Sequence, residues 1–116
     1  MVTLTANPAV THPIARETKI ILICKYTKAD IKGTLRWMHK GHLFTSTQTS
    51  KVANQADEGG LGVSHYTIEK VATSDSGAYT CAADYNAGGT KTSPTAVTLE
   101  VVGMSVILLA AIFAPR

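Results

Sequence analysis

Apolar and polar residues alternate with a period of two in short segments of the chain, and turn-forming residues separate these segments. Alternation of this kind is typical of β-strands that bury one face. The pattern predicts an all-β fold. The predicted strands lie at residues 2–12, 19–25, 34–40, 42–45, 49–53, 62–70, 78–85 and 95–102.

One set of alternate positions in each strand is expected to face the core. In the strand at 19–25, Ile20, Leu22 and Cys24 form this set, which leaves Ile21 and Ile23 on the other face. Isoleucine is unusual on a solvated face, so we expect a neighbouring strand or a partner to cover these two residues. The other positions predicted to face inward are Leu35, Trp37, Ser64, Tyr66, Ile68, Tyr79, Cys81, Ala83, Val97, Leu99 and Val101.

Proline, glycine and short polar residues mark the ends of the predicted strands. Pro8 and Pro13 lack the backbone N–H group, so the first segment is predicted to be an edge strand that passes from one sheet to the other. Residues 73–77 are predicted to form a turn and residues 86–89 a hairpin tip. Residues 46–60 are polar, and we expect only a short edge strand at 49–53 before a mobile turn.

Four residue types at fixed offsets carry a resemblance to a known family. Trp37 follows Cys24 by thirteen positions, and Tyr79 precedes Cys81 by two. On these residues the chain resembles an immunoglobulin superfamily domain, most closely the intermediate (I-set) type, over residues 1–102. Further matches are the Tyr66-x-Ile68-x-x-Val71 run, Asp75-x-Gly77 before Tyr79, and Ala83 followed by Asn86 and Gly89.

The resemblance implies an immunoglobulin-like β-sandwich of two antiparallel sheets, and it implies how these residues are used. Cys24 and Cys81 would form a disulfide between the sheets, and Trp37 would pack against it. The Tyr79 hydroxyl would form a hydrogen bond across a corner, and we group Asp75, from the same motif, with the core. A persistent disulfide implies an oxidising compartment, so the protein is expected outside the cell or at its surface. Two reduced thiols in an intracellular domain of the same fold are the alternative.

Function is implied by the same resemblance. Domains of this kind occur in adhesion molecules and receptor ectodomains, and also in giant muscle proteins. The chain is therefore expected to be an extracellular binding or adhesion module of a cell-surface protein, with a protein ligand or a second copy of itself as partner. The alternative is a structural spacer domain in an intracellular muscle filament protein. No cofactor is expected.

The candidate binding surface combines outward positions of two neighbouring predicted strands with the hairpin tip. Met38 is an apolar residue on a strand face, and Tyr85 is predicted to be an exposed aromatic residue beside it. Loops on a rigid sandwich often carry recognition. The full set is Arg36, Met38, Lys40, Thr80, Ala82, Asp84, Tyr85, Asn86 and Lys91.

Basic residues are concentrated in one part of the chain. The net charge is +3, and seven of the eleven basic residues lie between Arg16 and Lys40. An acidic glycan is therefore a further candidate partner. This hypothesis uses Lys25, Lys28, Lys32 and Arg36. The cluster is not interleaved with aromatic residues, so nucleic acid is not expected as a partner.

Catalytic and metal-binding motifs are missing from the sequence. It contains no nucleophile motif, phosphate-binding glycine loop or calcium loop, so we do not expect an enzyme. His39 and His42 have a spacing that could in principle serve a metal, but no third ligand lies in register, and a structural role is favoured. No metal is expected.

The C-terminal segment, residues 103–116, is predicted to lie outside the domain. It contains nine consecutive apolar residues from Val106 to Ala114. As a helix these reach about 13 Å, which is less than half of a hydrocarbon core. We consider a truncated membrane anchor, a vector-derived or packing segment, and a glycolipid-anchor signal as interpretations of it. The chain also opens without the charged start and apolar run of a signal peptide.

Overall fold

The computed structural model describes residues 2–8, 13–27, 35–86, 88–92 and 96–102, and at 55–58 and 91 it describes the backbone only. Its elements are β1 (Val2–Asn7), β2 (Ile14–Ala15), β3 (Ile20–Thr27), β4 (Arg36–His39), β5 (His42–Leu43), α1 (Ser46–Thr49), β6 (Val52–Glu58), β7 (Leu61–Ile68), a 3₁₀ turn (Thr73–Asp75), β8 (Gly77–Asp84), β9 (Thr90–Thr92), β10 (Val97–Leu99) and β11 (Val101–Val102).

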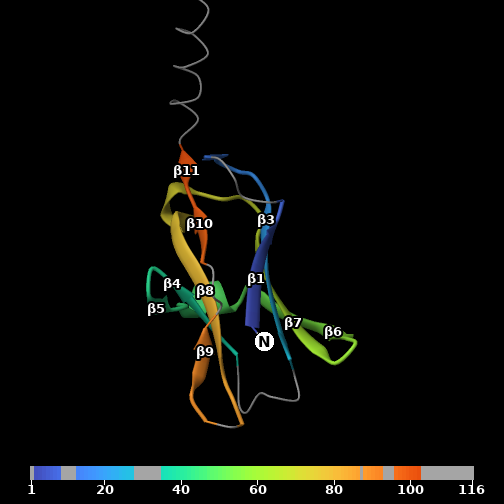
Figure 1. Cartoon of the computed structure of the whole chain (residues 1–116). Helices are drawn as coiled ribbons and strands as arrows, with labels where there is room; N and C mark the ends of the chain where they lie inside the picture. Colours follow the sequence, from blue (N-terminus) through green and yellow to red (C-terminus); the bar gives the residue numbers. More distant parts are fainter. Residues whose placement is uncertain (1, 9–12, 28–34, 87, 93–95, 103–116) are drawn as a thin grey trace, which may run out of the picture.

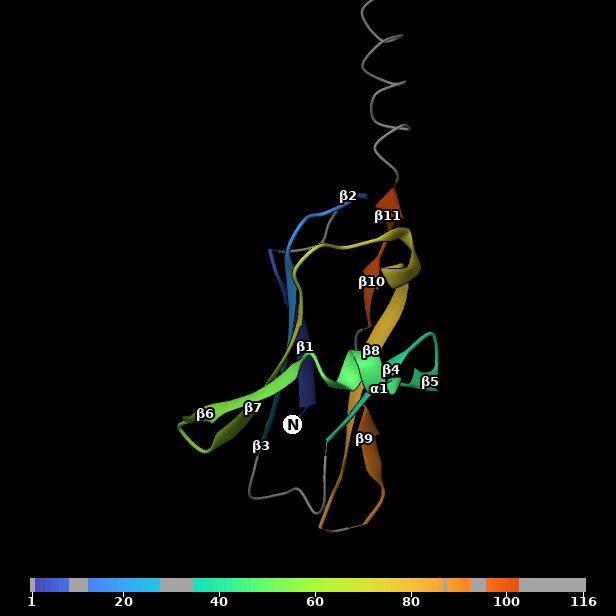
Figure 2. The ribbon, with the colours of Figure 1, turned by 180° about the vertical axis from the view of Figure 1, so that it is seen from behind.

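The strands form two facing sheets, as predicted (Figure 1). The first sheet has the order β1-β3-β7-β6, and its strands are antiparallel. The second sheet has the order β10-β8-β4-β5, and β9 also pairs with β8. Seen from behind, β6 and β7 extend away from the second sheet, while α1 lies near β4 and β5 (Figure 2).

The first segment changes partner between its two prolines, which confirms the predicted passage between sheets. β1 pairs with β3 in the first sheet. β2 pairs in parallel with β11, the strand that follows β10, and the two form a separate two-stranded sheet with Ile14 opposite Val101. The Ile14 backbone N–H also donates to the Glu100 carbonyl at 2.7 Å. The start of the chain therefore joins both layers of the sandwich.

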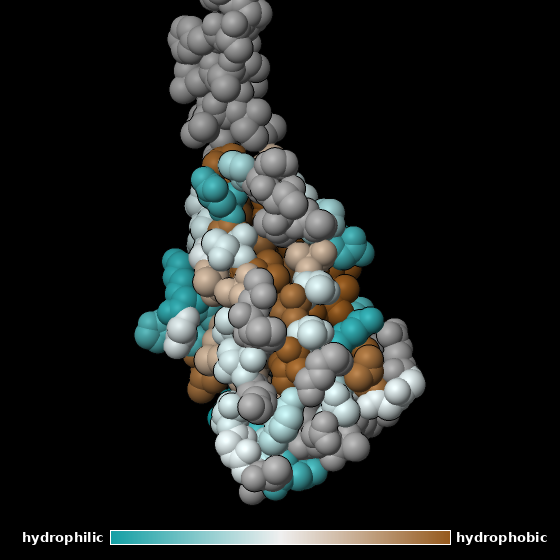
Figure 3. All heavy atoms as spheres, viewed as in Figure 1, coloured by the Kyte–Doolittle hydropathy of each residue, from teal (hydrophilic) through white to brown (hydrophobic). Residues whose placement is uncertain are grey.

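The predicted inward positions form the core. All of them are buried except Leu35 and Val97, which are half-buried and pack against the core. Ile21 and Ile23 lie on the outer face of the first sheet, where they are half-buried between β1 and β7. Figure 3 shows hydrophobic atoms along the middle of the molecule, where β1 and β3 run beside β8 and β10.

A disulfide joins the two sheets. Cys24 on β3 and Cys81 on β8 are bonded, with their Cα atoms 6.4 Å apart. Trp37 lies directly opposite Cys81 on the neighbouring strand and is buried. The Tyr79 hydroxyl donates to the Asp75 carbonyl oxygen at 2.6 Å, which is the predicted corner.

Asp75 is a corner residue and not a core residue, which corrects our grouping. It is half-buried, and its carboxylate accepts a hydrogen bond from the Ala72 backbone N–H at 2.8 Å. A carboxylate in this position stabilises the turn from its surface side and does not contribute apolar burial.

The prediction for residues 46–60 was wrong in two respects. Residues 46–49 form the short helix α1, and the strand that follows is longer than expected, at Val52–Glu58. Thr45 caps the helix, because its side chain accepts from the Gln48 backbone N–H at 3.2 Å while the Gln48 side chain accepts from the Thr45 N–H at 3.0 Å. This reciprocal pair is a capping box, and its spacing is visible in the sequence.

The predicted C-terminal segment, 103–116, lies outside the described residues, so its origin stays a prediction. Within the part of the chain that the structure describes, no helix has the length and apolar character needed to cross a membrane.

Candidate functional site

The outer face of the second sheet brings together most of the predicted binding surface. Arg36 and Met38 project from β4, and Thr80 and Asp84 from β8, the strand paired with β4. Lys40 lies in the turn after β4 and is exposed. The residues come from distant parts of the sequence, and the pairing of β4 with β8 places them on one surface.

An ion pair lies on this face. Arg36 Nη2 donates to Asp84 Oδ1 at 2.8 Å, and the two side chains are 41% and 42% exposed. The Thr90 hydroxyl donates to the same carboxylate oxygen at 2.7 Å. Both charges are therefore held in place by the sheet while they remain accessible to a partner.

Met38 has an apolar neighbour that the sequence analysis missed. Lys40 and Gly41 have φ angles of 54° and 78°, so a two-residue turn places Leu43 directly opposite Met38. Such turns need positive φ at both central positions. Leu43 is 64% exposed, and no other large hydrophobic residue is exposed in the described part of the chain.

Ala82 does not belong to the accessible surface, which corrects our prediction. It points outward between Arg36 and Thr92 on the adjoining strands, but it is only 1% exposed. A methyl group on a central strand is covered when its neighbours carry longer side chains. The ion pair with Asp84 holds the long Arg36 side chain over the Ala82 methyl group.

The hairpin tip differs in part from the predicted surface. Tyr85 is half-buried and packs against the core, whereas Asn86 is exposed. The predicted tip geometry is present, because the Tyr85 N–H donates to the Gly89 carbonyl at 3.0 Å and Gly89 has a positive φ of 78°. The Lys91 side chain lies outside the described residues.

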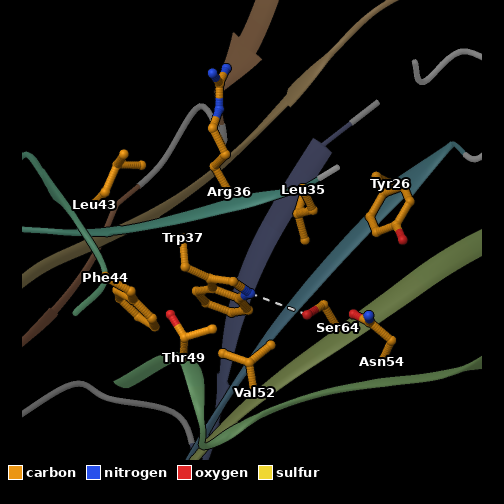
Figure 4. Close-up of a pocket in the computed structure, with 10 residues that line it drawn as sticks. All are labelled: Tyr26, Leu35, Arg36, Trp37, Leu43, Phe44, Thr49, Val52, Asn54 and Ser64. Carbon is orange, nitrogen blue, oxygen red and sulfur yellow. Dashed lines mark hydrogen bonds between the residues drawn. The ribbon is translucent and has the colours of Figure 1, made fainter. Parts of the chain in front are cut away.

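A hollow of about 610 Å³ lies beside this face, between the edges of the two sheets (Figure 4). Trp37 and Phe44 are stacked in its wall with their ring centroids 5.7 Å apart. The Trp37 indole N–H donates to the buried Ser64 hydroxyl at 3.1 Å. Figure 4 shows Arg36 and Leu43 on the opposite side of the ribbon from Trp37, so the rim of the hollow adjoins the outer face.

His39 is a structural residue. Its Nε2 lies 2.7 Å from the Ser76 carbonyl oxygen, and its Nδ1 lies 3.2 Å from Gln48 Nε2. A carbonyl oxygen can only accept, so Nε2 carries the proton and Nδ1 accepts from Gln48. The imidazole also stacks on the Tyr79 ring at 4.2 Å. Both ring nitrogens are thus used, and the described residues contain no cluster of three metal-ligating side chains.

Two buried tyrosines of the core, Tyr79 and Tyr66, have raised pKa values. Burial raises the pKa of the Tyr79 hydroxyl far above its ordinary value, and the neighbouring Tyr66 and Asp75 add to the effect. Burial also raises the pKa of Tyr66, with a further contribution from Asp75. Gln48 approaches the Tyr66 hydroxyl and opposes this rise, but that hydroxyl has no hydrogen-bond partner among the described residues.

The basic residues of the glycan hypothesis are not brought together in the described structure. Lys25 alternates with the buried Cys24 on β3 and belongs to the first sheet, whereas Arg36 lies on the second. Lys28 and Lys32 lie outside the described residues. The glycan partner therefore stays a prediction.

Comparisons with known proteins agree with this geometry. A model described as an immunoglobulin domain matches residues 3–84, and the chain belongs to this family. In fold it is similar to the Dscam1 Ig7 domain, isoform 5, with a TM-score of 0.58, 16% identity, and coverage of 87% of this chain and 98% of that one. It is also similar to a titin fragment, with a TM-score of 0.55, 22% identity, and coverage of 78% of this chain and 43% of the fragment. No curated protein sequence matches the chain.

Proposed function

We propose that this domain is an extracellular binding or adhesion module that recognises another protein through the outer face of its second sheet. The carrying observation is the exposure of Leu43 beside Met38, next to the Arg36–Asp84 pair. The Met38–Leu43 pair with polar and charged groups around it matches the anatomy of a protein interaction site, in which an apolar centre is surrounded by a polar rim. Immunoglobulin domains generally mediate protein–protein interactions and are typically not enzymes.

The disulfide supports the extracellular assignment. Cys24 and Cys81 are bonded, and the described chain contains no free cysteine. Structural disulfides persist in secreted and cell-surface proteins and are rare in the cytosol.

A spacer domain in an intracellular filament protein is the second candidate, because that role needs only the fold, which a titin fragment shares. The state of the thiols in the native cell separates the two candidates. Protein isolated from its source is alkylated without reductant and examined by mass spectrometry. We expect both cysteines to resist alkylation, and two alkylated thiols would contradict an extracellular module.

Binding through the outer face is tested with a substitution at its apolar residue. The domain is immobilised and presented with a panel of cell-surface ectodomains, including its own. Leu43→Asp places a charge in the apolar part of the face and should weaken any interaction found by at least about tenfold. Thr5→Asp is the matched control, because Thr5 is exposed on β1 in the other sheet. Equal binding by the wild type and the Leu43→Asp variant would exclude this face.

A further inference from the structure

The Arg36–Asp84 pair gives the outer face of the second sheet equal and opposite charges. The positive group comes from β4 and the negative group from the neighbouring β8. Thr90 fixes the carboxylate from the side of β9. The arrangement is a fixed charge dipole that lies across two adjacent strands.

The described side chains next to the pair are uncharged. Thr80 and Ala82 lie on β8 beside the pair, Thr92 lies on β9, and Met38 with Leu43 forms its apolar end. Lys40 lies in the turn beyond the end of β4. A surface that carries one positive and one negative group side by side is complementary in charge to an identical surface turned over.

We infer that a second copy of this chain docks on the outer face of the second sheet. This inference rests on the proposed function, because it names the protein that the binding face recognises. The two copies are related by a two-fold axis that runs parallel to the strands. The axis lies between the two molecules and passes over the boundary of β4 and β8. It therefore places β4 of each copy over β8 of the other. Arg36 of each copy then faces Asp84 of its partner. The same operation places Leu43 over β9 and β10 of the partner, where Thr92 and Thr98 point outward, and removes it from water.

Charge reversal tests this geometry, because the two reversed variants should complement each other. At the position of the pair, Arg36→Asp leaves two negative groups and Asp84→Arg leaves two positive groups. Sedimentation equilibrium of the whole chain should show a dimer for the wild type and at least about tenfold weaker self-association for each variant. An equimolar mixture of the two variants should dimerise again, since unlike charges face each other in the mixed pair.

The control reverses an exposed ion pair at the end of the first sheet, where Lys19 precedes β3 and Glu69 follows β7. Lys19 and Glu69 lie 3.7 Å apart, and the variants Lys19→Glu and Glu69→Lys should leave the dimer unchanged. A monomeric wild type, or variants that do not recover in the mixture, would overturn the inference. If Leu43→Asp still weakens binding to an ectodomain of another protein while the wild type is monomeric, the second copy is excluded and the proposed function stands.

Discussion

Removal of the Tyr79 hydroxyl tests the corner that joins β8 to the preceding turn. The Tyr79→Phe variant loses the 2.6 Å hydrogen bond to the Asp75 carbonyl while the buried ring stays in place. Loss of this hydrogen bond, between a buried hydroxyl and a half-buried carbonyl, costs about 1 kcal/mol, and up to about 3 kcal/mol where the carbonyl is left without a partner. For a domain with a free energy of unfolding of about 5–15 kcal/mol this is a large fraction. The midpoint of thermal unfolding should fall by about 4–8 °C for each kcal/mol by which the free energy of unfolding is lowered.

Tyr66 provides a matched control in the same core. Both rings are fully buried and their centroids lie 6.0 Å apart, but the Tyr66 hydroxyl has no partner among the described residues. Tyr66→Phe removes an unsatisfied polar atom, so it should leave the stability unchanged or raise it.

The assay is urea unfolding with the disulfide intact, followed by the fluorescence of Trp37, the single tryptophan of the chain. We expect a lower midpoint for Tyr79→Phe alone, with the slope of the transition unchanged. The reasoning assigns the stability to the corner hydrogen bond and not to the hydroxyl group itself. An equal loss of stability in the two variants, or a greater loss in Tyr66→Phe, would refute it.

Two further predictions concern the backbone and the pH dependence of stability. Glu17 has a φ of 70°, a conformation that glycine adopts without strain, so Glu17→Gly should raise the free energy of unfolding by about 1 kcal/mol. Arg16→Gly in the same turn should lower it. A lower urea midpoint for Glu17→Gly than for Arg16→Gly would contradict this prediction. The pKa values of Tyr66 and Tyr79 are raised in the folded protein. Their contribution to the free energy of unfolding is therefore complete below the unfolded-state pKa of about 10 and is lost as the pH rises above that value. The loss is at most about 1.4 kcal/mol per pH unit for each tyrosine. Unfolding midpoints that stay constant from pH 9 to about pH 11 would show that the hydroxyls ionise alike in both states.

Much of the fold could be predicted because its signals are local. Alternation assigned the strands and their inward faces, and Ile20, Leu22 and Cys24 are buried as expected. The family motif implied the disulfide and the Tyr79 corner, and both are present. The capping box of Thr45 and Gln48 is an equally local signal for the start of α1. The prediction for this segment rested on its polar composition and therefore missed the helix.

The binding face depended on pairings between distant segments. Arg36 and Asp84 are 48 positions apart and meet only because β4 pairs with β8. The exposure of Leu43 and the burial of Ala82 follow from which neighbours the sheet places beside them. Periodicity gives the side to which a residue points, but the area that it exposes is decided by the side chains that tertiary packing brings around it. The sequence by itself therefore determined the sandwich and its covalent link, and only the tertiary structure decided which part of its surface is apolar, charged and accessible.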